Sequence, residues 1–98
     1  MGRSYRIYDG GAYFRGNGRV EGFSPAETTI VWALMCRRRV FKEDLMEDLW
    51  PHPDFMPETW GDIIRVQIFR VRHKLKILGW KVTLAYGYGN GWRLEKIS

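Results

Sequence analysis

The longest regular pattern of apolar and polar positions runs from Ile63 to Leu78. Apolar residues recur there at intervals of three and four, which is typical of one face of an amphipathic helix. On a wheel of about 100° per residue, one stripe contains Ile64, Ile68, Val71, Leu75 and Leu78. We therefore expect a helix that begins near residues 58–61, buries this stripe and ends near Gly79, since glycine is a common stop.

The opposite face of this expected helix mixes basic, acidic and apolar residues. It carries Asp62, Val66, Phe69, Arg70 and His73, and the flanks carry Arg65, Arg72, Lys74 and Lys76. An arginine offers a planar fork to guanine or phosphate, and Val66 and Phe69 could pack on thymine methyl groups. Basic residues on an amphipathic helix are often only a solvated face, so this pattern alone leaves both interpretations open.

Glycine and asparagine residues divide the N-terminal segment into short β-prone runs. Gly10-Gly11 separates the first run from the second, and Gly16-Asn17-Gly18 separates the second from the third. Such residues supply the positive φ angles that tight hairpins require. Residues 5–22 are therefore expected to form an antiparallel meander.

The central segment carries signals for two more helices. Ser24-Pro25-Ala26-Glu27 is a capping box with proline at the first helical position, and it predicts a helix from Pro25 to Arg38. Cys36, within an apolar run, is expected to be a small buried hydrophobe. Leucines at helical spacing predict a second short helix over residues 42–50. The prolines that follow exclude regular structure in the next loop; they are Pro51, Pro53 and Pro57.

Two β-prone runs around a glycine-rich turn end the chain. They span residues 81–86 and 91–94. The whole pattern predicts one α+β domain over residues 1–98, in the order of a winged helix-turn-helix. Its parts are an N-terminal small antiparallel sheet (5–22), three helices (24–79) and a C-terminal β-hairpin wing (81–95).

Composition indicates which kind of partner and which cellular compartment to expect. Sixteen Lys and Arg residues against eleven Asp and Glu residues give a net charge of +5, which favours a polyanionic partner. Cys36 is the only cysteine, so an intrachain disulfide is impossible and a reducing compartment is expected. No apolar run reaches the ~20 residues of a membrane span, and the N-terminus lacks a signal-peptide core. We expect a cytoplasmic, nucleoid-associated protein without a membrane partner.

Four motifs, in their order and spacing, resemble the DNA-binding domain of OmpR/PhoB-type response regulators. They are Phe23-Ser24-Pro25-Ala26-Glu27, residues 40–50 with Glu43, Leu45 and Trp50, Ile64-x-Val66-x-Ile68-x-Arg70-x-Arg72-x-Lys74-Leu75, and Gly89-Asn90-Gly91-Trp92-Arg93-Leu94. The resemblance covers nearly the whole chain. It implies a regulator of transcription that binds double-stranded DNA, with the third helix in the major groove and the hairpin at the adjacent minor groove.

The resemblance also bears on assembly and control. One small domain reads only a few base pairs, so we expect stable occupancy to need two copies on neighbouring half-sites, as a homodimer or in tandem, or a partner protein. Head-to-tail tandem binding is what the resemblance implies. No receiver domain precedes the motifs, so we expect no phosphorylation switch within this chain.

The candidate DNA-binding residues lie in three groups. On the third helix they are Arg65, Val66, Gln67, Phe69, Arg70, Arg72, His73 and Lys74, beside it Arg37, Arg38, Arg39 and Lys42, and on the wing Tyr86, Tyr88 and Arg93. The arginines that end the first helix could clamp phosphates or only complement the helix dipole. Asp62 stands where the family usually has a basic residue, and it would repel phosphate unless it accepts from a cytosine amino group. Tyr86 and Tyr88 stand where the family often has an arginine.

An acidic segment suggests an alternative function, that of a protein-interaction module. Residues 43–58 contain six Asp and Glu residues and no Lys or Arg, so this segment should face away from DNA. In the resembling family the equivalent loop can contact RNA polymerase. Here Asp54, Phe55 and Met56 would form the docking surface within a proline-stiffened frame. Alternatively, Phe55, Met56 and Trp60 only close the core beneath the loop.

Catalytic and metal-binding interpretations are weak. His52, Asp54 and Glu58 have a spacing that is common by chance in a loop, and no second histidine is nearby in sequence. His73 is expected at the surface or at DNA rather than as a general base. We therefore expect no catalytic residue, no metal, no cofactor and no enzymatic activity.

Overall fold

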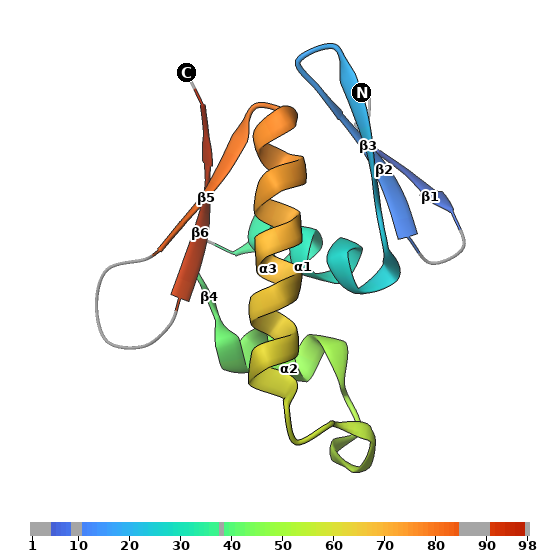
Figure 1. Ribbon diagram of the computed structural model, residues 1–98, viewed down its shortest axis with the longest axis vertical. Coiled ribbons are helices and arrows are strands. Elements are labelled where there is room, and N and C mark those ends of the chain that lie inside the picture. Colours follow the sequence, from blue (N-terminus) through green and yellow to red (C-terminus); the bar gives the residue numbers. More distant parts are fainter. Residues whose placement is uncertain (1–4, 9–10, 38, 85–90, 98) are drawn as a thin grey trace.

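Antiparallel sheets flank a group of helices in the computed structural model (Figure 1). The structure describes residues 5–8, 11–37, 39–84 and 91–97. Within these residues, one sheet is the meander β1 (Tyr5–Tyr8), β2 (Gly11–Gly16), β3 (Arg19–Phe23), and the other has the order β4 (Val40–Phe41), β6 (Gly91–Lys96), β5 (Trp80–Leu84). The helices are α1 (Pro25–Cys36), α2 (Lys42–Leu49) and α3 (Trp60–Ile77), with a short 3₁₀ turn η1 (Pro53–Phe55) before α3. This order of sheet, helices and hairpin agrees with the predicted order.

The turn between β2 and β3 anchors the first sheet to the helices. Asn17 and Gly18 have φ angles of 51° and 72°, a backbone that suits the twist of an antiparallel hairpin. A Cβ on Gly16 would overlap the carbonyl oxygen of Leu78, so the hairpin lies directly against the end of α3. Gly79 follows with a φ of 93°, as expected for the predicted helix stop. The first sheet therefore supports the C-terminal end of α3.

Helix α1 begins as its capping motif predicts. The Ser24 hydroxyl accepts a hydrogen bond from the Glu27 amide at 3.2 Å, and the Glu27 carboxylate accepts one from the Ser24 amide at 2.7 Å. The helix ends at Cys36 rather than at Arg38, because Arg37 already has an extended backbone. The expected burial of Cys36 is wrong. Its side chain is exposed because it lies about 200° around the helix from the buried Leu34.

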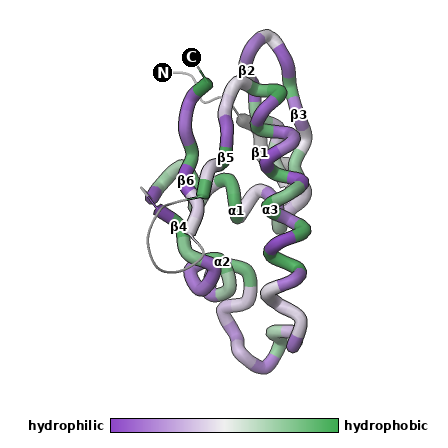
Figure 2. The backbone as a smooth tube through the Cα atoms, turned by 60° about the vertical axis from the view of Figure 1, so that its left-hand side comes forward, coloured by the Kyte–Doolittle hydropathy of each residue, from purple (hydrophilic) through white to green (hydrophobic). Residues whose placement is uncertain are grey.

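The core lies between α1, α3 and the two sheets, and Figure 2 shows the hydrophobic part of α1 between α3 and the β5–β6 hairpin. The stripe of α3 expected from the sequence is buried. The buried apolar residues of these two helices are Ile30, Val31, Ala33, Leu34, Ile64, Ile68, Val71 and Leu75. Phe14 and Phe23 of the first sheet pack edge to face, with ring centroids 5.2 Å apart. Burial of each large apolar side chain stabilises the fold by about 1.5–3 kcal/mol. The packed core therefore fixes the position of α3.

The segment between α2 and α3 leaves part of its apolar surface outside the core. Asp44 accepts a hydrogen bond from the Phe41 amide at 2.9 Å and so begins α2. Trp60 packs against the core and Met56 is half-buried, but Phe55 is 78% exposed. The idea that these aromatic residues close the core is therefore wrong for Phe55 and right for Trp60. Among the described helices, none has the length and apolar character needed to cross a membrane.

Candidate nucleic-acid interface

The outward face of α3 exposes basic and apolar side chains together. The exposed residues of this face are Asp62, Arg65, Val66, Phe69, Arg70, Arg72 and His73, and we call them the α3 ridge. Val66 and Phe69 keep 50% and 62% of their surface exposed, although both are large hydrophobic residues. In Figure 1, α3 lies in front of α1. The split between a buried stripe and an outward face agrees with the wheel.

Two contacts order the α3 ridge. The rings of Phe69 and His73 meet edge to face, with centroids 4.6 Å apart. An Arg65 nitrogen lies 3.9 Å from an Asp62 oxygen, but both side chains are more than three-quarters exposed, so this pair contributes little stability. Arg70 and Arg72 form no ion pair with any described residue. Their guanidinium groups are therefore open to an external anion.

A cleft separates α3 from the β5–β6 hairpin. Its inner part has a volume of about 490 Å³ and is lined by Phe69, Arg72, His73, Lys76, Lys81, Val82, Thr83 and Ile97. An adjoining hollow continues from Arg72 and Lys81 along the hairpin to Trp92, Arg93 and Glu95. Four lysine and arginine side chains line the two hollows against one acidic residue. The cleft is therefore suited to an anion, which would contact α3 and the hairpin together.

The register of the hairpin determines which of its side chains share a face. Lys81 is opposite Glu95 and Thr83 is opposite Arg93, so these four side chains share one face of the hairpin. Glu95 pairs with Lys81 at 3.6 Å and with Arg93 at 2.9 Å. One negative charge is thus shared by two positive ones, and the hairpin keeps a net positive charge beside α3. The candidates Tyr86 and Tyr88 lie outside the described residues.

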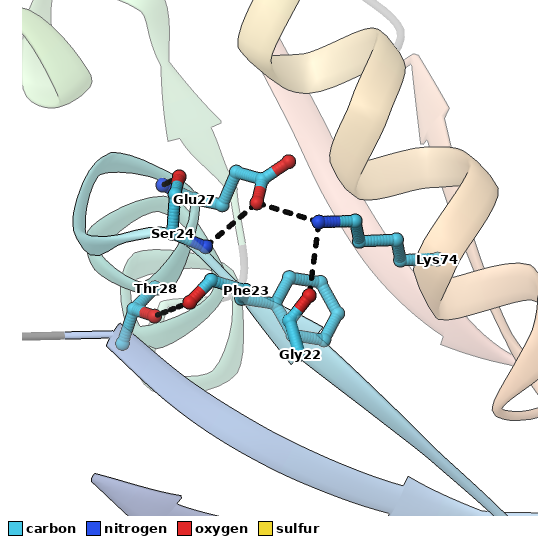
Figure 3. Close-up of polar contacts among 6 residues, drawn as sticks. All are labelled: Gly22, Phe23, Ser24, Glu27, Thr28 and Lys74. Atoms are coloured by element: carbon cyan, nitrogen blue, oxygen red, sulfur yellow. Dashed lines mark hydrogen bonds and ion pairs between the residues drawn. The ribbon is translucent and has the colours of Figure 1, made fainter. Parts of the chain in front are cut away.

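Lys74 is engaged in contacts within the protein. Its ammonium group donates hydrogen bonds to Glu27 Oε1 at 2.8 Å and to the Gly22 carbonyl oxygen at 2.9 Å (Figure 3). It also lies 5.3 Å from the centroid of the Phe23 ring. The wheel placed Lys74 on a flank of the helix, and this flank turns out to face β3 and the start of α1. Lys74 therefore joins α3 to the rest of the fold and leaves the candidate interface.

Glu27 is the buried partner in this contact. Only 3% of its surface is exposed, and one carboxylate oxygen accepts from both the Ser24 amide and the Lys74 ammonium group. Burial alone would raise the pKa of Glu27, but the hydrogen bonds from Lys74 and Ser24 and the charge of Lys74 lower that pKa below its ordinary value. Glu27 is therefore charged at neutral pH. The resulting ion pair links α3 to the start of α1.

Arg37, at the C-cap of α1, is occupied by a contact with α2. Its two terminal nitrogens donate to the Asp48 carboxylate oxygens at 2.9 Å and 3.4 Å. The hydrogen bond and the charge of Asp48 raise the pKa of Arg37. Because Asp48 compensates this charge, Arg37 is a weaker candidate for phosphate than the sequence indicated. Arg38 lies outside the described residues.

Arg39 and Lys42 lie beside aromatic rings. The Arg39 guanidinium carbon is 5.9 Å from the centroid of the Phe41 ring, and Lys42 Nζ is 5.2 Å from that of Trp60. A Cβ on Gly61 would lie 3.2 Å from Lys42 Nζ. Lys42 thus places a positive charge next to the first turn of α3.

Gln67 lies at the edge of the α3 ridge. It is half-buried and lines a hollow shared with Pro25, Ala26 and Thr29 of α1 and with Leu49 and Trp50 near the end of α2. Its Oε1 atom is enclosed and has no hydrogen-bond partner among the described residues. Gln67 therefore faces the junction of the three helices more than the outside.

The acidic segment offers a different surface. Asp54 and Phe55 are exposed in η1 and Met56 is half-buried. The His52 and Phe55 rings meet edge to face at 6.3 Å. In the described part of the chain, no group of three His, Cys, Asp or Glu side chains is placed to hold a metal ion.

The cleft brings together candidate residues whose proximity the sequence could not predict. Two residues that were not candidates also line it. Phe69, Arg72 and His73 of α3 meet Arg93 across the two hollows, as part of the candidate list. Lys76 and Lys81 also line the cleft but were not among the candidates. Lys76 follows Arg72 by one helical turn, and Lys81 alternates with the buried Val82. These two spacings were the available signals.

The helix pair α2–α3, the first sheet and the β5–β6 hairpin together form a winged helix-turn-helix fold with an N-terminal sheet. A solved structure with this fold, similar over 98% of both chains, is the crystal structure of the DNA-binding domain of the response regulator AdeR in complex with an intercistronic region. The two have a TM-score of 0.59 and 16% sequence identity, so the likeness is one of fold. No family model and no curated protein matches the chain. The predicted fold is confirmed.

Proposed function

We propose that this chain binds double-stranded DNA and regulates transcription, with α3 in the major groove and the β5–β6 hairpin beside it. The observation that carries the proposal is the row of cations along the α3 ridge and the cleft. These residues are Arg65, Arg70, Arg72, Lys76, Lys81 and Arg93. Among the described residues of the ridge and the cleft, the acidic ones are Asp62 and Glu95. Such a surface binds the phosphate backbone, which supplies most of the salt-dependent affinity for DNA.

The dimensions of α3 suit this role. The helix has 18 residues, which corresponds to about 27 Å in length. The major groove of B-DNA is about 12 Å wide and admits one helix. The AdeR DNA-binding domain, which has the same fold, was crystallised with an intercistronic region. We assign phosphate contacts to the lysine and arginine residues of the cleft and base-edge contacts to the remaining ridge residues, with Arg70 as the main polar reader.

Stable occupancy should require two copies of the domain. A single module of this kind buries a small area on DNA and reads few base pairs. Two copies in head-to-tail order on neighbouring half-sites would double the number of phosphate contacts. Band-shift titrations with one and two copies of a selected half-site would detect such tandem binding as a second, tighter complex.

The experiment that tests the proposal measures binding to duplex DNA as salt is varied. A selection from random duplexes supplies the probe. Replacing Arg70 and Arg72 together by alanine should weaken binding at least about tenfold and reduce the slope of log K against log salt by about one or two. Both side chains are exposed, so the fold should remain intact.

A matched control removes the same charge from a different surface. Arg15 and Arg19 are exposed on the hairpin of the first sheet, and their double replacement by alanine also lowers the net charge by two. The proposal expects this control to retain most of the affinity. Equal losses in the two double variants would mean that only net charge matters, and unchanged binding in the Arg70/Arg72 variant would rule out α3 as the DNA reader.

A second candidate function, docking on RNA polymerase or another regulator, is favoured by the exposed Phe55. A large aromatic side chain that is 78% exposed beside Asp54 and Met56 is typical of a contact residue. Phe55→Ala should reduce the capture of RNA polymerase while DNA binding persists. Capture that is unchanged in this variant would remove the candidate.

A further inference from the structure

Two apolar side chains stand inside the basic surface of α3. Val66 and Phe69 are 50% and 62% exposed, and they lie between Arg65 and Arg70 along the helix. The buried stripe on the other side of α3 supplies its contacts with the core. Neither Val66 nor Phe69 belongs to the buried core or packs against it, so both side chains are available to a ligand.

The charges around the two residues indicate the chemistry of that ligand. Arg65, Arg70 and Arg72 are all exposed next to them, so a partner must be both polyanionic and apolar at closely spaced points. The major groove of DNA has this combination, because the C5-methyl group of thymine projects into a groove bordered by phosphates. A purely apolar partner would leave the arginines without an anion, and burying them unpaired would be costly.

The geometry of the two residues suits neighbouring base pairs. Positions 66 and 69 are about 4.5 Å apart along the helix axis. Successive base pairs of DNA are about 3.4 Å apart along the duplex axis. The Phe69 and His73 rings meet edge to face with their centroids 4.6 Å apart, and Val66 is β-branched. Both side chains are thus restricted before binding, so less conformational entropy is lost on contact.

We propose that Val66 and Phe69 read the C5-methyl groups of thymine, and that the preferred ligand is duplex DNA with thymines on adjacent steps of the half-site. This inference rests on the proposed function and adds a substrate class to it. Arg70 would then supply the polar contact, whereas the two apolar residues reject bases that lack the methyl group.

Uracil tests this inference because it differs from thymine only by the absent methyl group. The duplex retained by the selection is synthesised once with thymine and once with uracil, and wild-type protein is titrated with each. We expect about three- to fivefold weaker binding for each methyl group contacted, and roughly tenfold for two. A selected duplex without A·T pairs at its contacted positions would overturn the inference, and so would equal binding of the two duplexes.

Variants then locate the effect. The double variant Val66→Ala and Phe69→Ala should bind the thymine and uracil duplexes equally, and Val66→Thr, which keeps one methyl, should give an intermediate ratio. Ile77→Ala removes an exposed apolar residue of the same helix and should keep the wild-type ratio. A thymine preference that survives in the double variant would overturn the assignment. Failure of wild-type protein to bind either duplex would instead contradict the proposed function itself.

Discussion

The two faces of α3 differ in what their side chains contact, and therefore in what their substitution should change. The inward face contains Ile64, Ile68, Val71 and Leu75, which are buried, and on the flank beside it Lys74 reaches Glu27. The outward face contains exposed residues with few contacts inside the molecule. Substitutions on the inward face should therefore lower the stability of the fold, whereas substitutions on the outward face should change DNA binding.

The largest expected effect is the loss of a core side chain. Ile64 is 0% exposed, so Ile64→Ala should lower the free energy of unfolding by about 2–5 kcal/mol because it leaves a cavity. Val66→Ala, two residues away on the outward face, should change it by less than about 0.5 kcal/mol. Urea unfolding followed by circular dichroism measures both. Similar losses in the two variants would contradict the separation of the faces.

The next effect concerns the buried ion pair between α3 and α1. Glu27→Gln removes the carboxylate that accepts from Lys74 and Ser24, and it should cost about 1–3 kcal/mol of stability. DNA affinity measured well below the unfolding temperature should fall only modestly, since Lys74 lies away from the ridge. A loss of affinity as large as that of the Arg70/Arg72 variant would show that DNA binding depends on this ion pair.

The ion pair between Glu27 and Lys74 should make the stability of the fold depend on pH. The pKa of Glu27 is lowered in the folded protein. The stabilisation by the Glu27 carboxylate is therefore fully present above the pKa of a glutamate in the unfolded chain, about 4.3. That contribution is lost as the pH falls through the lower folded pKa. Stability should therefore decrease in acid, and Glu27→Gln should make the decrease shallower between pH 5 and pH 3. Parallel profiles for the two proteins would show that Glu27 does not titrate as proposed.

The smallest expected effect comes from the acidic residue on the outward face. Asp62 is exposed and only loosely paired with Arg65 at 3.9 Å. If it repels phosphate, Asp62→Asn should strengthen DNA binding by about two- to fivefold without a change in stability. A weaker complex, confined to duplexes with a particular cytosine, would show instead that Asp62 accepts from a cytosine amino group.

The sequence predicted what depends on local spacing. The stripe of Ile64, Ile68 and Val71 and the capping box at Ser24 follow from helix geometry alone, and the structure agrees with both. Cys36 was misplaced because an apolar run near a helix end was taken as buried. The wheel was applied to the third helix alone, whereas Cys36 lies in α1.

Contacts between segments that are distant in the chain could not be predicted from the sequence. Lys74 has the same wheel position whether it faces solvent or a partner, and its acceptor Glu27 is 47 positions away in the chain. Lys81 lines the cleft only because the hairpin folds back beside α3. Side chains on a helix flank are therefore the ones whose role needs the tertiary structure.

Amide chemical shifts of labelled protein during titration with the selected duplex test the proposed DNA-binding face most directly. Binding by the α3 ridge and the cleft predicts that shifts change most over residues 62–76, 81–84 and 91–95, and little over residues 52–57. Changes centred on residues 52–57, with the outward face of α3 unaffected, would contradict the proposal.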